Sequence, residues 1–208
     1  MDQPAYEYHK TTSYERSKMD GHLLDWDNQP DVFKTYADSE LVEMPKGIPL
    51  PGEDLFTLYD RPFLQEKPEA IRDLEDLSRI LFLTYTLTSQ ARHSNGTFYY
   101  RSAASAGALY PTEIYVALEG ISGVEPGLYH FSVARHGLIR LRDGCLSGTV
   151  RKAIIAKKTA ACPITFFLTA IFFRSAWKYR ARAYRYHLLD TGHVLENLIL
   201  ALKAEGLS

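Results

Sequence analysis

The feature that most constrains this chain is an almost unbroken apolar run over residues 163–173, rich in Phe, Ile and Thr. Its β-branched and aromatic side chains favour a strand, and they have to be removed from water. Because the run is well short of the roughly 20 residues that cross a bilayer, the rest of the protein must bury it. We therefore expect a central strand that is covered on both faces.

The remaining pattern mixes helices and strands in an order that indicates an α+β sandwich rather than repeated βαβ units. Apolar residues at helical spacing predict a helix over 68–84 and a helical segment from 175 to the end, interrupted around Gly192. The further expected elements are strands at 113–119, 128–133 and 137–141, a short helix at 149–157 and a polar loop at 87–98.

Charge is distributed unevenly along the chain. Residues 1–60 hold 13 Asp or Glu against 5 Lys or Arg, whereas residues 61–208 hold 12 against 19. A cluster of Gly and Pro near residues 47–52 separates the two parts, so we expect an acidic lead-in over 1–52 and a compact domain over 53–208. Residues 1–52, called the arm below, either lie over the basic domain or form a solvated lead-in.

Composition excludes several classes of protein. With 46% hydrophobic residues, 14 Tyr and 10 Phe, the chain is too apolar to be disordered. No basic patch followed by an apolar stretch opens it, so we expect a cytoplasmic protein without a secretory signal or membrane segment. A formal net charge of −1 argues against nucleic acid as a partner. Two cysteines cannot form a disulfide framework, and the seven histidines contain no metal-binding motif, so no metal site is expected.

A run of very small residues, 102–108, precedes the strand expected at 113. Such a segment lets a flat ligand approach the backbone N–H groups, while Arg101, Ser102 and Ser105 add a cation and two hydroxyl donors. The alternative is a tight crossing against a neighbouring helix, where small residues only avoid clashes. Neither a dinucleotide-binding G-x-G-x-x-G nor a phosphate-binding P-loop is present.

A basic and aromatic segment, 173–187, contains five Lys or Arg and no acid. On a helix, Lys178, Arg182 and Arg185 would share one face, where an anion, solvent or the acidic arm would relieve their mutual repulsion. Lys178 also precedes Tyr179, and an ammonium beside a phenol favours the phenolate, which is a candidate general base.

These segments belong to a series of ordered blocks that covers nearly the whole chain. The blocks are Tyr8-His9, Leu24-Asp25-Trp26, residues 105–111, Glu113, Tyr115, Gly127-Leu128-Tyr129-His130, Arg174, Trp177-Lys178-Tyr179, residues 182–186 and Gly192-His193. The series resembles the SagB-type dehydrogenases, a group of FMN-dependent nitroreductases that includes the thiazoline and oxazoline oxidases of modified-peptide biosynthesis.

The resemblance implies a nitroreductase-like three-layer sandwich, with helices flanking a mostly antiparallel sheet, and a dimer that holds FMN at the subunit interface. FMN would accept a hydride from an azoline ring, while Tyr179, assisted by Lys178, would take the proton. The residues that would bind the cofactor are Arg101, Ser102, Ser105, Ala106, Gly107, Arg182 and Arg185.

Two other functions stay open: NAD(P)H-dependent reduction of nitro or quinone compounds, and a degenerate, non-catalytic half of a nitroreductase-like dimer. The expected partners are a second copy or a tandem half, a peptide or small-molecule substrate, and a cyclodehydratase complex. The chain departs from the family in carrying Arg180 after the Lys-Tyr pair, where Gly is common. It also stops at residue 208, where the family continues into further strands, which leaves a truncated domain as one interpretation.

Overall fold

The computed structural model describes residues 3–18, 21–62, 71–93, 96–153 and 163–207. The helices are α1 (Pro4–Thr12), α2 (Leu55–Asp60), α3 (Leu74–Tyr85), α4 (Ser147–Ala153), α5 (Phe172–Tyr179) and α6 (Ala183–Ala204), with short 3-10 turns η3 (Ala106–Ala108) and η4 (Arg180–Arg182) near the site. The strands are β1 (Leu41–Glu43), β2 (Leu87–His93), β3 (Gly96–Arg101), β4 (Thr112–Leu118), β5 (Gly127–Ser132), β6 (Gly137–Asp143) and β7 (Ile164–Ala170).

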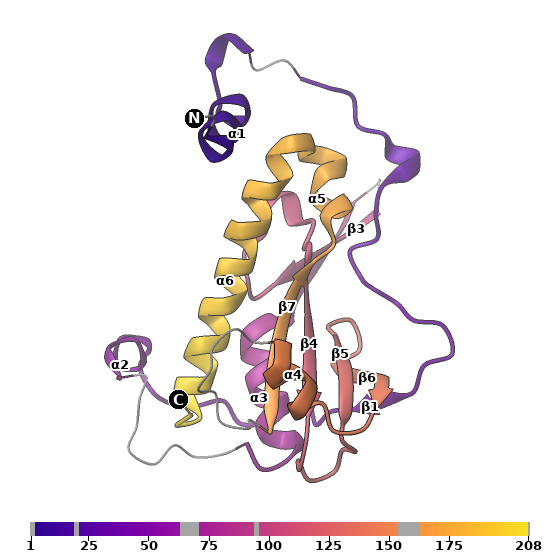
Figure 1. Ribbon diagram of the computed structural model, residues 1–208, viewed down its shortest axis with the longest axis vertical. Coiled ribbons are helices and arrows are strands. Elements are labelled where there is room, and N and C mark those ends of the chain that lie inside the picture. Colours follow the sequence, from indigo (N-terminus) through magenta and orange to yellow (C-terminus); the bar gives the residue numbers. More distant parts are fainter. Residues whose placement is uncertain (1–2, 19–20, 63–70, 94–95, 154–162, 208) are drawn as a thin grey trace.

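Five strands form one sheet in the order β1-β6-β5-β4-β7, and each neighbouring pair is antiparallel. The hairpin β2–β3 forms a separate two-stranded sheet. Helices pack on the main sheet, so the predicted α+β architecture with a mostly antiparallel sheet is confirmed (Figure 1). No helix in the described ranges is both long and apolar enough to span a membrane.

Successive side chains of β4 point to opposite faces of the sheet, and the larger core lies on one of these faces. Ile114 and Val116 point to the face covered by α3, where they join Leu77 and Leu81 in one buried cluster. The Asp73 carboxylate caps α3 by accepting the backbone N–H groups of the first turn. Helix α6 packs against the far side of α3 through a smaller cluster of Ile80, Leu198 and Ala201.

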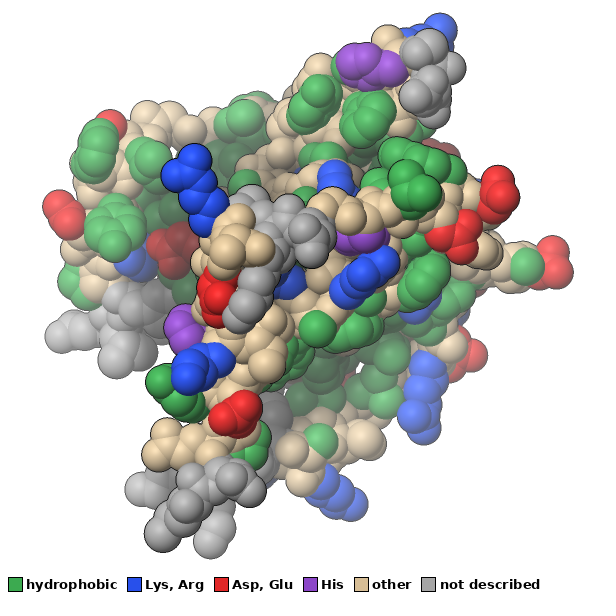
Figure 2. All heavy atoms as spheres, turned by 90° about the horizontal axis from the view of Figure 1, so that it is seen from above, with side chains coloured by type: hydrophobic (Ala, Val, Ile, Leu, Met, Phe, Trp, Pro, Cys, Tyr) green, Lys and Arg blue, Asp and Glu red, His purple; other side chains and the backbone are tan. Residues whose placement is uncertain are grey.

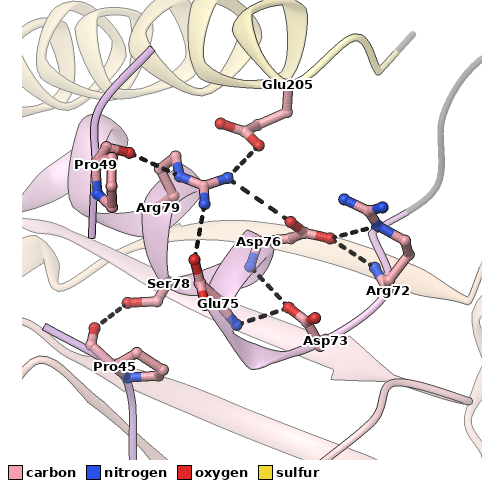
Figure 3. A network of polar contacts seen from close by, with 9 residues as sticks. All are labelled: Pro45, Pro49, Arg72, Asp73, Glu75, Asp76, Ser78, Arg79 and Glu205. Carbon is pink, nitrogen blue, oxygen red and sulfur yellow. Dashed lines mark hydrogen bonds and ion pairs between the residues drawn. The ribbon is translucent and has the colours of Figure 1, made fainter.

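A polar network fixes the end of this helical layer (Figure 3). The guanidinium of Arg79 on α3 donates to Glu205 after α6 at 2.6 Å and to the Pro49 carbonyl at 3.1 Å. Ser78 donates to the Pro45 carbonyl at 2.6 Å. The segment 45–49 and the end of α6 are thereby tied to the same two turns of α3.

The N-terminal arm takes part in the folded body. β1 pairs with β6 at the edge of the sheet, and Met44 is buried in the main core. Figure 1 shows α6 on one side of the sheet and the arm descending along the other. The residues from 41 to 44, which the expected boundary at 52 assigns to the lead-in, are therefore integral to the sheet and its core.

Three local predictions are wrong. The apolar run does form β7, but β7 lies at the end of the sheet rather than in its centre, and Phe172 and Phe173 begin α5. The strand is not covered on both faces either, because none of its residues is fully buried. Residues 87–93 and 96–98 belong to the β2–β3 hairpin instead of a loop. The last helical segment continues through Gly192 and breaks at Arg180.

The other expected elements have counterparts close to their predicted bounds. The strands expected at 113–119, 128–133 and 137–141 correspond to β4, β5 and β6. The helix expected over 68–84 starts at Leu74 within the described residues, and the one expected over 149–157 corresponds to α4 up to Ala153. Residues 68–70 and 154–157 of these predictions lie outside the described ranges.

Candidate functional site

The small-residue segment forms a tight loop between β3 and β4, and Asp190 of α6 holds it in place. The Ser105 hydroxyl donates to Asp190 Oδ2 at 2.6 Å, and the Ala106 N–H donates to Oδ1 at 3.2 Å. Ser105 Oγ also accepts the Tyr110 N–H at 2.9 Å. Burial raises the pKa of Asp190, although its two hydrogen-bond donors oppose the rise. Sequence reasoning missed Asp190, and its signal was an isolated acid after a basic stretch.

The loop meets the Lys-Tyr pair at Gly107. Gly107 has a φ of +65°, and a Cβ built on it would lie 2.6 Å from Tyr179 Oη and 3.1 Å from Lys178 Nζ. Only a residue without a side chain fits this contact without displacing the pair. The structure therefore brings together the two segments that the sequence singled out, through the backbone of one and the side-chain ends of the other.

A break in the helix places the Lys-Tyr pair at its end. α5 ends at Tyr179, and Arg180 has φ +49° and ψ −131°, far outside helical values. The predicted common face of Lys178, Arg182 and Arg185 is therefore wrong, because the break reorients the chain between the first of these residues and the other two. Upstream of the break, the Trp177 indole donates to the Asp25 carbonyl at 2.6 Å.

Tyr179 lies in a group of tyrosines. Its ring centroid is 4.4 Å from that of Tyr186, whose hydroxyl is 3.0 Å from the Tyr14 hydroxyl. Burial raises the pKa of Tyr179, and the nearby Tyr14 and Asp190 raise it further. Burial and the Tyr14 hydrogen bond also raise the pKa of Tyr186 to about 12. Tyr179 is thus a neutral phenol near neutral pH, contrary to the expectation that Lys178 would favour the phenolate.

Arg182 and Arg185 bind the N-terminal arm. Arg182 Nε donates to the Thr12 carbonyl at 3.0 Å, and its guanidinium lies 3.7 Å from the centre of the Tyr14 ring. Arg185 Nη2 donates to Thr12 Oγ1 at 2.8 Å. Contacts with the arm were one expected way to satisfy these charges. The contacts use a carbonyl, a hydroxyl and an aromatic ring.

Arg101 and Ser102 both have internal partners. Arg101 is buried and donates to the Val32 carbonyl at 2.6 Å. Its guanidinium lies over the rings of Phe33, Tyr85 and Tyr110. Its Nε and Nη1 atoms are buried and have no hydrogen-bond partner among the described residues. Ser102 Oγ donates to the Thr84 carbonyl at 3.1 Å. Arg101 therefore anchors the arm, while Ser102 links the loop to the end of α3.

A fully buried charged group underlies α5. Arg174 Nη1 donates to Glu113 of β4, and the other Glu113 oxygen is 2.6 Å from His130 Nε2. Burial alone would raise the pKa of Glu113, but His130 and Arg174 outweigh burial and hold it below its ordinary value. Arg174 Nε also donates to the Asp31 carbonyl at 2.7 Å. The start of α5, one turn before Lys178, is thus fixed to the sheet and the arm. Sequence reasoning included these three side chains only through the family resemblance.

A cleft of about 510 Å³ opens beside the Lys-Tyr pair, between the arm and the turn that joins α5 to α6. Its described lining residues are Thr11, Thr12, Tyr14, Gly21, His22, Leu24, Lys178, Tyr179, Arg180, Ala181 and Arg182. This lining includes cations and no Asp or Glu. Figure 2 looks onto this end of the molecule, where Lys and Arg side chains lie among apolar ones. The cleft gives a ligand access to Tyr179 from outside.

The sequence profile of the nitroreductase family matches residues 67–208, which is more than half of the chain. The protein belongs to the nitroreductase family. It is 30% identical over 172 residues to a candidate nitroreductase, MJ1384 of Methanocaldococcus jannaschii, with 82% of each chain covered. A crystal structure of a candidate nitroreductase from Anabaena variabilis matches with a TM-score of 0.74 at 34% identity. The protein is thus a nitroreductase-family oxidoreductase.

Two further matches are a toxin-processing protein and a microcin synthetase complex. The chain is 28% identical to the trifolitoxin-processing protein TfxB of Rhizobium leguminosarum bv. trifolii, over 91% of this chain and 53% of TfxB. The E. coli microcin synthetase McbBCD complex shares the fold, with a TM-score of 0.55 at 15% identity. This chain spans about half of TfxB and 38% of the Anabaena protein.

The segment 102–108 can be compared with the needs of a flat cofactor such as a flavin, which is typical of this family. Ser102, Ala104 and Gly107 are exposed, so a flat ring can approach these positions. The N–H groups of Ser102, Ala106 and Ala108 already donate within the protein, so they are not free for a ligand as the sequence suggested. Lys178 adds a cation at the same point, where it would stabilise the negative charge of a reduced flavin. Ser105 and Ala106 are fixed by Asp190, so this face is already rigid before a cofactor binds.

Proposed function

We propose that this nitroreductase-family protein is an FMN-dependent dehydrogenase that oxidises thiazoline or oxazoline rings of a modified peptide to azoles. The observation that carries the proposal is the contact of Lys178 and Tyr179 with the bare backbone of Gly107. It puts a proton-transfer group and a cation beside the segment best suited to a flavin. The relation to TfxB, whose name describes toxin processing, supports a peptide as the substrate.

The loop, Tyr179 and Lys178 have separate roles in the proposed reaction. The loop of Ser105, Ala106 and Gly107 would hold the cofactor ring, and FMN, when bound, would supply a hydride acceptor. Tyr179, as the phenolate, removes the proton from the ring carbon next to the one that loses the hydride. Lys178 would stabilise the negative charge that develops at the cofactor. The ring thus loses one hydride and one proton and gains one double bond.

The second wall of the cofactor site is proposed to come from a partner subunit. Helix α6 exposes an apolar stripe of Tyr184, Leu188 and Leu195, which are spaced so that they lie on one side of the helix. A second copy packed on this stripe would bury it and form a two-fold dimer. A tandem half of a longer protein could contribute the same surface. A cyclodehydratase that forms the azoline is the proposed further partner.

A purified protein tests the proposal directly. The protein should be yellow with the spectrum of an oxidised flavin, and anaerobic addition of a thiazoline-containing peptide should bleach it and yield a thiazole. Tyr179→Phe should lower the bleaching rate by about a hundredfold, the scale typical of a lost general base. Tyr59→Phe, at an exposed tyrosine on α2, is the matched control and should bleach normally. A protein that binds no flavin, or a Tyr179→Phe variant with the wild-type rate, would contradict the proposal.

A second candidate function is the reduction of nitro or quinone compounds by NAD(P)H, which the identity with MJ1384 favours. The two functions differ in the source of the electrons. Rapid bleaching by NADH or NADPH, with turnover of a nitroaromatic and no thiazole product, would identify the reductase. In that case Tyr179→Phe should leave the bleaching rate unchanged, because hydride transfer from a nicotinamide needs no base at the substrate carbon.

A further inference from the structure

Arg180 occupies a backbone conformation that is suited to glycine. Its φ of +49° and ψ of −131° lie outside the regions open to residues with a Cβ, so the position is strained. The strained residue directly follows Tyr179, where it ends α5 and begins η4. Strain of this kind persists where the surroundings impose it, and it occurs often at functional sites.

The Arg180 side chain has no partner that accounts for its charge. It is exposed and lines the cleft, yet its guanidinium makes no hydrogen bond or ion pair with any other described residue. Lys178, on the same wall, likewise has no hydrogen bond or ion pair within the described ranges. Arg182, by contrast, is bound to Thr12 and Tyr14 of the arm. Two positive charges therefore face the cleft, and neither forms an ion pair with a described residue.

The cleft suits a small anion next to a reacting ring. Its wall from Lys178 to Arg182 carries the cations and the candidate base, and the arm supplies hydroxyl groups and His22 on the other side. No carboxylate stands among the described lining residues to compete for Arg180. A guanidinium binds a carboxylate through two parallel hydrogen bonds, which gives orientation as well as affinity.

We infer that Arg180 is a specificity residue that binds a carboxylate of the substrate, so that this cleft takes azolines with a free carboxylate on the ring, as in an azoline at the C-terminus of a peptide. The carboxylate would dock on Arg180, and the ring would lie toward Tyr179, the preceding residue. This inference rests on the proposed function and adds the charge of the substrate. The same cations could instead receive the phosphate of FMN, so the experiment separates these two sources of the anion.

Binding of two unreactive probes tests the inference. Thiazole-4-carboxylate and thiazole-4-carboxamide share the ring and differ in charge, and their affinities for the full chain can be measured by calorimetry without turnover. The wild type should bind the carboxylate about tenfold more tightly than the amide, the scale of one charge-assisted hydrogen-bonded pair. Arg180→Gly should reduce this ratio to about one, and Arg180→Lys should restore part of it. Arg151→Ala, which removes an exposed charge on α4, is the control and should keep the full ratio.

The outcomes distinguish the inference from the function on which it rests. A wild-type ratio near one, or an unchanged ratio in Arg180→Gly, would overturn the inference even if the protein oxidises thiazolines. A loss of FMN affinity relative to riboflavin in Arg180→Gly, with the thiazole ratio intact, would assign the cations to the cofactor phosphate and also overturn it. A tenfold ratio that depends on Arg180 supports the inference, even in a preparation that shows no thiazoline oxidation.

Discussion

Replacing Gly107 with Ala tests whether the contact between the loop and the Lys-Tyr pair matters for the chemistry. The new methyl group would lie 2.6 Å from Tyr179 Oη, so the hydroxyl would have to retreat by about 0.8 Å to reach ordinary contact at 3.4 Å. The φ of +65° adds a backbone cost of roughly 1–2 kcal/mol for any residue with a Cβ. We expect a modest loss of stability and a larger loss of activity.

Stability and activity can be separated with a second glycine. Gly120 has a similar φ of +73° and no atom within 4 Å of its added Cβ, so Gly120→Ala carries the backbone cost alone. Both variants should lower the melting temperature by roughly 2–8 °C, which is the range for about 1–2 kcal/mol in a chain of this size. Gly107→Ala alone should lower kcat for thiazoline oxidation, by about 10–100-fold, because an ångström of misplacement is costly in catalysis.

The reasoning would be refuted if the two glycine variants had the same kcat as the wild type. It would also be refuted if kcat fell equally in both, since the loss would then follow from the backbone and not from Tyr179. A double variant provides an internal check. In Gly107→Ala/Tyr179→Phe the clashing hydroxyl is absent, so the added methyl group should change stability by no more than Gly120→Ala does.

Other expected outcomes follow from the titratable groups and the strained turn. Because the pKa of Tyr179 is raised above its ordinary value of 10, kcat/KM for thiazoline oxidation should rise about tenfold per pH unit up to pH 10, and a flat profile would exclude Tyr179 as the base. The pKa of Glu113 is lowered in the folded protein, so as the pH falls below 4.5 the unfolded chain binds the proton first, and the stabilisation that the charged carboxylate gives above pH 4.5 is lost. Acid unfolding of Glu113→Gln should lack this contribution to stability. An acid transition identical to that of the wild type would show that the pKa of Glu113 is not lowered by folding. Asp190→Ala should cost roughly 1–3 kcal/mol by denaturant unfolding, since it leaves two donors without an acceptor, whereas Glu196→Ala on the exposed side of α6 should cost little. Arg180→Gly should raise the melting temperature, because it relieves the backbone strain, and a lower value would show that the side chain stabilises the turn.

Strand and helix patterns in the sequence predicted most of the fold, because the spacing of apolar residues indicates which side chains are buried. β4, β5, β6 and α3 follow such patterns closely. The position and partial exposure of β7 could not be read this way, since an apolar run indicates that a strand needs cover but not whether this chain supplies it. The β2–β3 hairpin was missed because β2 is mostly polar and exposed, and because the three aromatic residues of β3 are consecutive, so neither strand shows an apolar alternation.

The candidate site was predictable where its chemistry depends on residue type. The small side chains around Gly107 and the Lys178-Tyr179 pair are visible in the sequence, and the structure brings them into contact. The partners of Arg182 were not predictable, because they are set by the break at Arg180, which reorients the chain after α5. Asp190 required the structure as well, since it lies 85 residues from Ser105 in the sequence.

Two buried arginines bind the arm, and these contacts limit how far the protein can be truncated from its N-terminal side. Arg101 and Arg174 bind the successive carbonyls of Val32 and Asp31. A recombinant fragment that starts at residue 53 would leave both guanidinium groups short of an acceptor, at roughly 1–3 kcal/mol each, against a total folding stability of about 5–15 kcal/mol. Domain swaps and library designs that treat the first fifty residues as a detachable leader would therefore remove part of the scaffold that keeps α5 in position.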